Sequence, residues 1–391
     1  MTYHIDQTYL IQQFDATRRL SEDICKPLAI EDYVPQPITD VSPPKWHLAH
    51  TTWFFEQFIL VKYVPEYQVF DSDFAYLFNS YYNAMGERTL RAERGFMTRP
   101  TVWQIYQYRK YVNEAVGVFL SSPQSQEVCS VIEIGIHHEQ QHQELLVYDL
   151  KFILGQQPTY PVYGSGFKGE IETYEKKWIS CEEGIYTIGA DGKSFAYDNE
   201  LEAHQVYVEA FQVRNTLVTN SEYLQFVEDG GYRQHQLWHA EGWDYINLHE
   251  VKNPLYWHQI DGQWHSYNLD GLKPLEKEAP VQHISFYEAS AFAEWSGARL
   301  PTEFEWEIAA DKFAWGQLWE WTLSAYLPYP RFAKAPGALG EYNGKFMLNQ
   351  NVLRGASVAT PPNHSRKTYR NFFHASARWV FNGIRLAQNI A

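Results

Sequence analysis

The sequence of 391 residues predicts an α+β protein in which a helical domain precedes a mixed, loop-rich domain. Up to about Gly155, apolar residues recur in steps of three and four, the spacing of amphipathic helices. Beyond that point, short strand-like runs alternate with turns rich in Gly and Pro. We therefore expect an antiparallel four-helix bundle over residues 1–156, a linker over 157–180 and a second domain over 181–391.

The predicted helices of the first domain follow from their apolar stripes and their stop signals. The pattern over 45–64 is typical, because Trp46, Trp53 and Phe58 are spaced so that they lie near one helix face. The predicted helices cover residues 9–20, 45–64, 101–120 and 128–152.

The second domain is expected to combine short strands with short helices. Strand-like runs occupy 185–189 and 204–208, and helical patterns occupy 220–229 and 285–296. Thr302 with Glu305 three residues later has the pattern of a capping box, which is a structural feature of a helix start.

Composition excludes several classes of protein. The net charge of −15 argues against nucleic acid and against an anionic membrane as general partners. The three cysteines, Cys25, Cys129 and Cys181, form no CxxC pair, so neither a disulfide framework nor a thiolate metal site is expected. The sequence shows no signal peptide and no run of the ~20 apolar residues that a membrane span needs. A cytoplasmic protein is expected.

The segment from His138 to His142 carries the strongest chemical signal. In a helix, residues four apart share one face, so both imidazoles could bind one metal ion. A third ligand is available in Trp46-His47-Leu48-Ala49-His50, where spacing does not decide between His47 and His50. From the residues alone zinc is favoured over iron(II), although ligand type does not separate the two metals.

Two other interpretations of the segment stay open at this stage. His138-Glu139-Gln140-Gln141-His142 also matches the HExxH pattern of zinc hydrolases, in which Glu139 would be the general base. Alternatively, the histidines could belong to an ordinary polar helix face.

A second notable stretch covers residues 78–91. Its tyrosines could donate a proton to a bound oxygen species, and its arginines could grip a substrate carboxylate. A structural role is equally compatible, because the chain contains 28 tyrosines and arginines usually face solvent. Residues 369–386 combine polar and aromatic groups, as the wall of a pocket or a core would.

Several of these motifs together resemble one family, the ergothioneine-biosynthesis sulfoxide synthases. The family's signatures are matched by residues 42–56, 78–91 and 138–146, and its C-terminal domain by the VTNxEY, RLPTExEWE, WEWT, LRG and GxRLA elements. The resemblance implies a DinB-like four-helix bundle, a formylglycine-generating-enzyme-like domain related to C-type lectins, and an active site between the two. It also implies iron(II) as cofactor and dioxygen as co-substrate.

The resemblance also implies residue roles. Iron would be bound by His50, His138 and His142, and hercynine by Gln141 and Asn371. Arg88 and Arg91 match positions that hold the carboxylate of the thiol substrate. Tyr81 and Tyr82 match a tyrosine pair that supplies a proton or a hydrogen bond. The full set of expected site residues is His50, Tyr81, Tyr82, Arg88, Arg91, His138, Gln141, His142, Asn371, Phe372 and Phe373.

The expected reaction joins the sulfur of cysteine to the imidazole C2 of hercynine (Nα-trimethylhistidine) and gives a sulfoxide. Phe373 stands where the branch that uses γ-glutamylcysteine has an aspartate, which favours free cysteine. Close alternatives are γ-glutamylcysteine or a selenium donor on the same scaffold. More distant ones are a zinc hydrolase and a binding protein that has lost its chemistry. Formylglycine generation is not expected, because no cysteine lies late in the chain.

Overall fold

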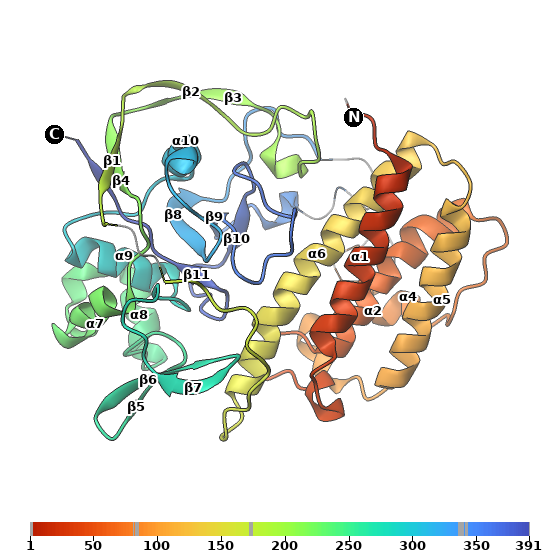
Figure 1. The fold of residues 1–391 in the computed structure, drawn as a ribbon, viewed down its shortest axis with the longest axis horizontal. Coiled ribbons are helices and arrows are strands. Elements are labelled where there is room, and N and C mark those ends of the chain that lie inside the picture. Colours follow the sequence, from red (N-terminus) through yellow and green to blue (C-terminus); the bar gives the residue numbers. More distant parts are fainter. Residues whose placement is uncertain are drawn as a thin grey trace. The chain divides into compact units, whose positions relative to one another are not determined.

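The computed structural model describes residues 3–80, 82, 86–171, 175–334, 340 and 343–390. The chain divides into two compact units (Figure 1). The helical unit consists of Met1–Gly164, Ala335–Tyr342 and Thr360–His364. The mixed unit consists of Ser165–Lys334, Asn343–Ala359 and Ser365–Ala391.

The helical unit is built on long helices that begin at clear sequence signals. Asp6 caps α1, Thr101 forms a capping box with Gln104 at α5, and Ser125 caps α6. The helices are α1 (Gln7–Cys25), α2 (Pro44–Phe55), α3 (Val61–Tyr63), α4 (Phe74–Leu77), α5 (Val102–Leu120) and α6 (Gln126–Gly155). A π-helical turn, Glu56–Leu60, connects α2 to α3, so the helix predicted over 45–64 is continuous but irregular.

Helix α2 occupies the centre of this unit. Every residue from Pro44 to Phe55 is buried, and α2 packs against α1, α5 and α6. Gly135 lets α6 approach α2 closely, because a Cβ atom there would lie 2.9 Å from the Phe54 ring and 2.7 Å from the Phe55 ring. The close approach brings side chains of the two helices within contact distance. The prediction that this part is helical is confirmed, whereas its DinB-like class stays a prediction.

The mixed unit contains small sheets surrounded by loops and short helices. One sheet has the strand order β10-β9-β8-β11, in which β8 and β11 are parallel and the other pairs antiparallel; further sheets have the orders β1-β4-β12, β5-β6-β7 and β2-β3. The strands are β1 (Trp178–Cys181), β2 (Gly184–Ile188), β3 (His204–Val208), β4 (Phe211–Arg214), β5 (Trp257–Ile260), β6 (Gln263–Asn268), β7 (Gly271–Pro274), β8 (Trp319–Ala325), β9 (Asn351–Gly355), β10 (Asn371–Phe373), β11 (Asn382–Gly383) and β12 (Ala387–Asn389).

Three helices of the mixed unit start at capping boxes, formed by Thr219, Ser285 and Thr302. The predicted capping box of Thr302 and Glu305 is confirmed at the start of α10. The helices are α7 (Asn220–Glu228), α8 (Ala240–Leu248), α9 (Phe286–Trp295) and α10 (Glu303–Ala309). Trp319 and Trp321 of β8 are buried, and the buried Glu320 between them pairs with Arg385 at 2.7 Å. The WEWT segment is therefore part of the buried scaffold of the mixed unit.

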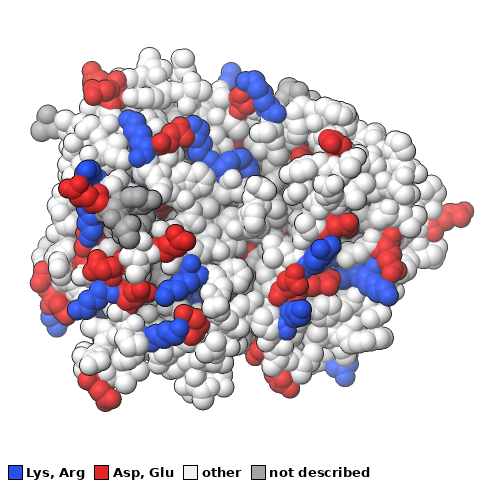
Figure 2. All heavy atoms as spheres, viewed as in Figure 1, with Lys and Arg blue, Asp and Glu red and all other residues white. Residues whose placement is uncertain are grey.

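The unit boundaries add one feature that the sequence did not indicate. The first boundary falls between Gly164 and Ser165, but residues 360–364 return to the helical unit. Among the described residues, no helix is long and apolar enough to span a membrane. On the face drawn in Figure 2, basic and acidic side chains are intermixed rather than separated by sign.

Candidate metal centre

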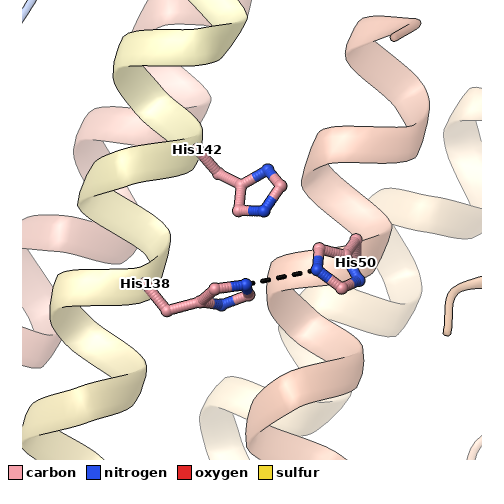
Figure 3. A group of neighbouring side chains, drawn as sticks. All are labelled: His50, His138 and His142. Atoms are coloured by element: carbon pink, nitrogen blue, oxygen red, sulfur yellow. Dashed lines mark hydrogen bonds between the residues drawn. The ribbon is translucent and has the colours of Figure 1, made fainter. Parts of the chain in front are cut away.

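Three histidines from two helices of the helical unit converge on one point (Figure 3). His50 projects from α2, and His138 and His142 project from successive turns of α6. One ring nitrogen from each lies within 4.8 Å of those of the other two, and His50 Nε2 lies 3.2 Å from His138 Nε2. The predicted i, i+4 pair therefore does share a face, and it meets a histidine of α2.

Aromatic rings hold His50 in place on α2. Its imidazole is stacked between Trp46, at a centroid distance of 4.5 Å, and Trp53, at 5.6 Å. These residues stand four before and three after His50, so all three rings share one helix face. His50 Nδ1 lies 2.6 Å from the carbonyl oxygen of Phe78. Because a carbonyl only accepts, Nδ1 carries the hydrogen and Nε2 offers its lone pair to the cluster.

Burial keeps the three imidazoles neutral. It lowers the pKa of His138 to about 4. Burial and the adjacent His138 hold the pKa of His50 well below its ordinary value. Burial, with His138 and His50 beside it, does the same for His142. Neutral imidazoles are the form that binds metal.

His47, the alternative ligand left open by spacing, is not one of the three histidines whose ring nitrogens converge. Its Nε2 lies 2.9 Å from Asp149 Oδ2, and its Nδ1 lies 2.9 Å from Nδ1 of His142. Both ring nitrogens of His47 are therefore engaged outside the point where the other three histidines meet. The geometry separates His47 from His50, which the sequence did not.

Glu139, the potential base of the HExxH interpretation, lies on a different face of α6. It is buried against α1 and α5, where Arg18 and Arg109 contact its two oxygens at 2.7 and 3.0 Å and Ser21 donates a hydrogen bond of 2.6 Å. Burial alone raises the pKa of a carboxyl group, but here the two guanidinium groups and Ser21 outweigh it and lower the pKa of Glu139 to about 2. A carboxylate so paired cannot accept a proton from a metal-bound water, so the zinc-hydrolase alternative is wrong in its assignment of the base.

The cluster fits a divalent transition metal with open coordination positions. Three converging neutral imidazoles are a suitable donor set for zinc or iron(II), and they leave positions for substrates. His138 Nδ1 is buried and has no hydrogen-bond partner among the described residues, so His138 is fixed by packing against Phe54 at 4.8 Å. The donor set does not itself select the metal.

The predicted tyrosine pair is only partly described. Tyr81 lies outside the described residues. Tyr82 is buried, and its ring stacks on Trp53 at 5.6 Å, so a single aromatic ring separates it from His50. Its backbone is held by Asn79, whose side chain exchanges hydrogen bonds with both its N–H and its carbonyl group.

The predicted carboxylate-binding arginines lie in the same segment, and a third arginine accompanies them. Arg88 and Arg91 are half-buried and donate to the carbonyl oxygens of Ser80 and Asp40. Arg94, which sequence reasoning missed, is buried, and its guanidinium lies 3.4 Å from the centroid of Trp46. It continues the three-residue spacing of Arg88 and Arg91, which was the available signal.

Gln141 is half-buried on α6, between the histidine face and the face that contacts residues 360–364. On that second face, His364 lies 3.2 Å from Gln140 Oε1 and 3.3 Å from His137 Nδ1, and Thr360 donates to Glu144. No local sequence pattern indicates this contact, because more than 200 residues separate the partners. The role of Gln141 in binding hercynine stays a prediction.

The remaining predicted contacts form β10 of the mixed unit. Strand alternation places Asn371 and Phe373 on one face and Phe372 on the other. Phe372 is stacked on Tyr326 at 4.1 Å. This packing favours Asn371 and Phe373 over Phe372 as groups that could contact a substrate.

A three-histidine cluster on helices, with His50 and His138 buried and His142 half-buried, combined in one chain with a mixed α+β unit, defines a candidate metalloenzyme. Residues 167–315 match the sulfatase-modifying factor enzyme 1-like domain family. A hercynine oxygenase from Mycolicibacterium thermoresistibile is 30% identical over 315 residues, covering 65% of this chain and 68% of that protein. The chain therefore belongs to the hercynine oxygenase family.

Other relatives agree with this assignment. A hercynine oxygenase from Mycobacterium tuberculosis is 29% identical over 312 residues, which are 66% of this chain and 72% of that protein. The formylglycine-generating enzyme of Bos taurus is 27% identical over 157 residues, which are only 37% of this chain and 42% of that enzyme. Similarity to the hercynine oxygenases thus extends over much more of the chain.

Proposed function

We propose that this protein is an iron(II)- and dioxygen-dependent sulfoxide synthase that joins the sulfur of cysteine to the imidazole C2 of hercynine, a step of ergothioneine biosynthesis. The observation that carries the proposal is the convergence of His50, His138 and His142 in a member of the hercynine oxygenase family. The reaction balances without an external reductant. The S–H and C–H hydrogens leave as water with one oxygen atom of O2, and the other oxygen atom enters the sulfoxide.

In this proposal His50, His138 and His142 hold the iron. Bound iron(II) would supply a redox-active Lewis acid that lowers the pKa of a thiol and activates dioxygen. The protein keeps the three imidazoles neutral by burial and fixes His50 between two tryptophan rings. Such preorganisation is what a catalytic metal site requires from its protein.

The resemblance to the family also supports roles for other residues in binding the substrates. Arg88 and Arg91 would receive the carboxylate of the thiol substrate, because a guanidinium presents two parallel N–H groups to a carboxylate. Gln141 and Asn371 would contact hercynine. The hydroxyl group of Tyr82, or that of Tyr81, would supply a proton or a hydrogen bond to the reacting oxygen.

Phe373 supports cysteine as the thiol donor. It is half-buried and packs edge-on against Trp379 at 6.0 Å. An apolar ring in this place offers no counter-charge to the ammonium group of the glutamyl moiety of γ-glutamylcysteine. γ-Glutamylcysteine and a selenium donor are therefore treated as competing substrates in the test.

The test is product analysis by mass spectrometry. Protein loaded with iron(II) is incubated in air with hercynine and an equimolar mixture of cysteine, γ-glutamylcysteine and a selenosugar. We expect the hercynylcysteine sulfoxide to predominate and oxygen uptake to require both hercynine and the thiol. The matched control is His138→Ala, which should give no coupled product. Fully iron-loaded wild-type protein that couples none of the donors would refute the proposed function.

A further inference from the structure

His142 is connected to a buried carboxylate through a second histidine. Asp149 Oδ2 accepts a hydrogen bond of 2.8 Å from the backbone N–H of Ser42, and His47 Nε2 lies 2.9 Å from the same oxygen. On the other side of the His47 ring, Nδ1 lies 2.9 Å from Nδ1 of His142. Asp149 and His47 are both buried, whereas His142 is half-buried.

The carboxylate determines which atom is the donor in each hydrogen bond of the series Asp149–His47–His142. Asp149 Oδ2 is an acceptor, so His47 Nε2 must carry the hydrogen that lies between them. A neutral His47 then has a lone pair on Nδ1, and the hydrogen between the two imidazoles must belong to Nδ1 of His142. As a result, His142 has its lone pair on Nε2.

We propose that His47 and Asp149 are positioning residues that hold His142 in the Nδ1–H tautomer, with the Nε2 lone pair available to the metal. This inference rests on the proposed metal centre. It gives His47 a role that differs from the ligand role left open by its spacing. His50 obtains the same tautomer from a backbone carbonyl, so the two helices use different acceptors for one purpose.

The opposite tautomer of His47 is disfavoured in this environment. It would turn a lone pair of Nε2 toward Asp149 Oδ2, leaving two acceptors facing each other in a buried place. In this series of hydrogen bonds, the His47 imidazole connects the Asp149 carboxylate to His142, a ligand of the proposed metal ion. Carboxylate–histidine arrangements of this kind increase the basicity of a metal ligand.

The sequence contains both positioning residues at helical spacing. His47 precedes His50 by three residues on α2, and Asp149 follows His142 by seven residues on α6. Residues seven apart lie on nearly the same helix face, so Asp149 stands two turns beyond His142. The pairing of His47 with Asp149 requires the two helices to be packed together, and local spacing does not predict it.

The first experiment observes the tautomers in the metal-free protein. Long-range 15N–1H correlation spectra of 15N-histidine-labelled protein distinguish Nδ1–H from Nε2–H imidazoles. We expect His142 and His50 to be Nδ1–H and His47 to be Nε2–H, with assignments from His→Ala variants. A wild-type His142 that carries its hydrogen on Nε2 would overturn the inference, and this result does not depend on metal binding.

The second experiment measures metal affinity by anaerobic titration with iron(II) and cobalt(II). His47→Phe keeps a ring but removes the acceptor, and we expect it to weaken binding about 10- to 100-fold. His47→Asn places an amide oxygen near the position of Nδ1 and should recover most of that loss. His137→Asn, a change on a different face of α6, is the matched control and should bind like the wild type. Thermal unfolding of each metal-free variant identifies changes that only destabilise the fold.

The outcomes separate this inference from the proposed function. If His142→Ala abolishes metal binding while His47→Phe and His47→Asn bind like the wild type, the positioning role is wrong and the metal centre stands. If the wild type itself binds neither metal, the proposed metal centre fails. If His47→Phe weakens binding and His47→Asn restores it, both the positioning role and the metal centre are supported.

Discussion

Two faces of α6 carry buried polar clusters of opposite design. Glu139 faces Arg18 and Arg109, and this cluster contains its own balancing charges. His138, its immediate neighbour in sequence, faces His50 and His142, which are neutral and direct ring nitrogens toward one another. The first cluster pairs its carboxylate with cations, whereas in the second the ring nitrogens of three histidines converge and no cation lies between them among the described residues. On this one helix, a cluster whose charges are paired within the protein has a structural role, and a cluster of converging neutral imidazoles is a candidate binding site.

The largest expected effect concerns the structural face. Glu139→Gln leaves two buried guanidinium groups without their carboxylate, and we expect it to lower the free energy of unfolding by about 3–5 kcal/mol. Urea denaturation followed by helical circular dichroism measures this change. Glu22→Gln is the control, because Glu22 is partly exposed and its contact with Arg109 is longer, at 3.3 Å, so less than about 1 kcal/mol is expected.

The same Glu139→Gln variant tests the assignment of function to the two faces. Protein that remains folded should bind iron(II) within a few-fold of the wild type and retain coupling activity. A variant with unchanged stability and no activity would instead support Glu139 as a general base. It would contradict the assignment of a purely structural role to this face of α6.

The ligand face should respond in the opposite way. His142→Ala removes one of three donors, and we expect metal affinity to fall by more than the roughly 100-fold that loss of an outer hydrogen-bond partner costs. The metal content of anaerobically loaded protein, measured with the thermal midpoint of the metal-free form, separates this loss from unfolding. Full metal content in the variant would show that His142 is not a ligand.

Acid should weaken the two faces in different pH ranges. The pKa of His138 is about 4 in the folded state against 6.5 for the free side chain, so the unfolded chain gains its proton first as the pH falls from 6.5 to 4. Stability present above pH 6.5 is thus lost over this range, by up to about 3 kcal/mol in the metal-free protein. For Glu139, with a pKa of about 2 against 4.5, the corresponding loss lies between pH 4.5 and 2.

Variants show which face of α6 causes the loss of stability in each pH range. In urea titrations of metal-free protein at a series of pH values, His138→Ala should reduce the loss of stability between pH 6.5 and 4 by the contribution of His138, while His50 and His142 still contribute. Glu139→Gln should reduce the loss below pH 4.5. Identical profiles for the wild type and both variants would show that other groups dominate acid unfolding.

The smallest structural effect is expected at Tyr82. Tyr82→Phe keeps the ring that stacks on Trp53 and should change stability by less than about 1.5 kcal/mol, the contribution of one hydrogen bond. Iron binding should be unchanged, while the products should shift from the sulfoxide toward oxidised thiol. Product ratios by mass spectrometry provide the measurement. An unchanged ratio would remove Tyr82 from the reaction and leave Tyr81 as the candidate.

The comparison also explains which parts of the site the sequence could predict. Helical spacing placed His138 and His142 on one face, and it placed Glu139 about a quarter turn away from His138. Spacing could not show what lies opposite each face, because Arg18 and Arg109 come from helices distant in sequence. Residues 360–364 were missed for the same reason, because their contacts depend on how the chain returns to α6. Arg94 was missed although it continues the spacing of Arg88 and Arg91, and its contact with Trp46 is made only in the folded chain.

By itself, the sequence determined the order of helical and mixed regions, the capped helix starts and the paired histidines, because these depend on periodicity and on neighbours within a few residues. Only the tertiary structure decided that His50 faces the cluster and that His47 faces Asp149. Three residues apart on α2, these histidines differ by about one sixth of a turn, which spacing does not resolve. The packing of α2 against α6, at the close approach that Gly135 permits, turns that small difference into two distinct roles.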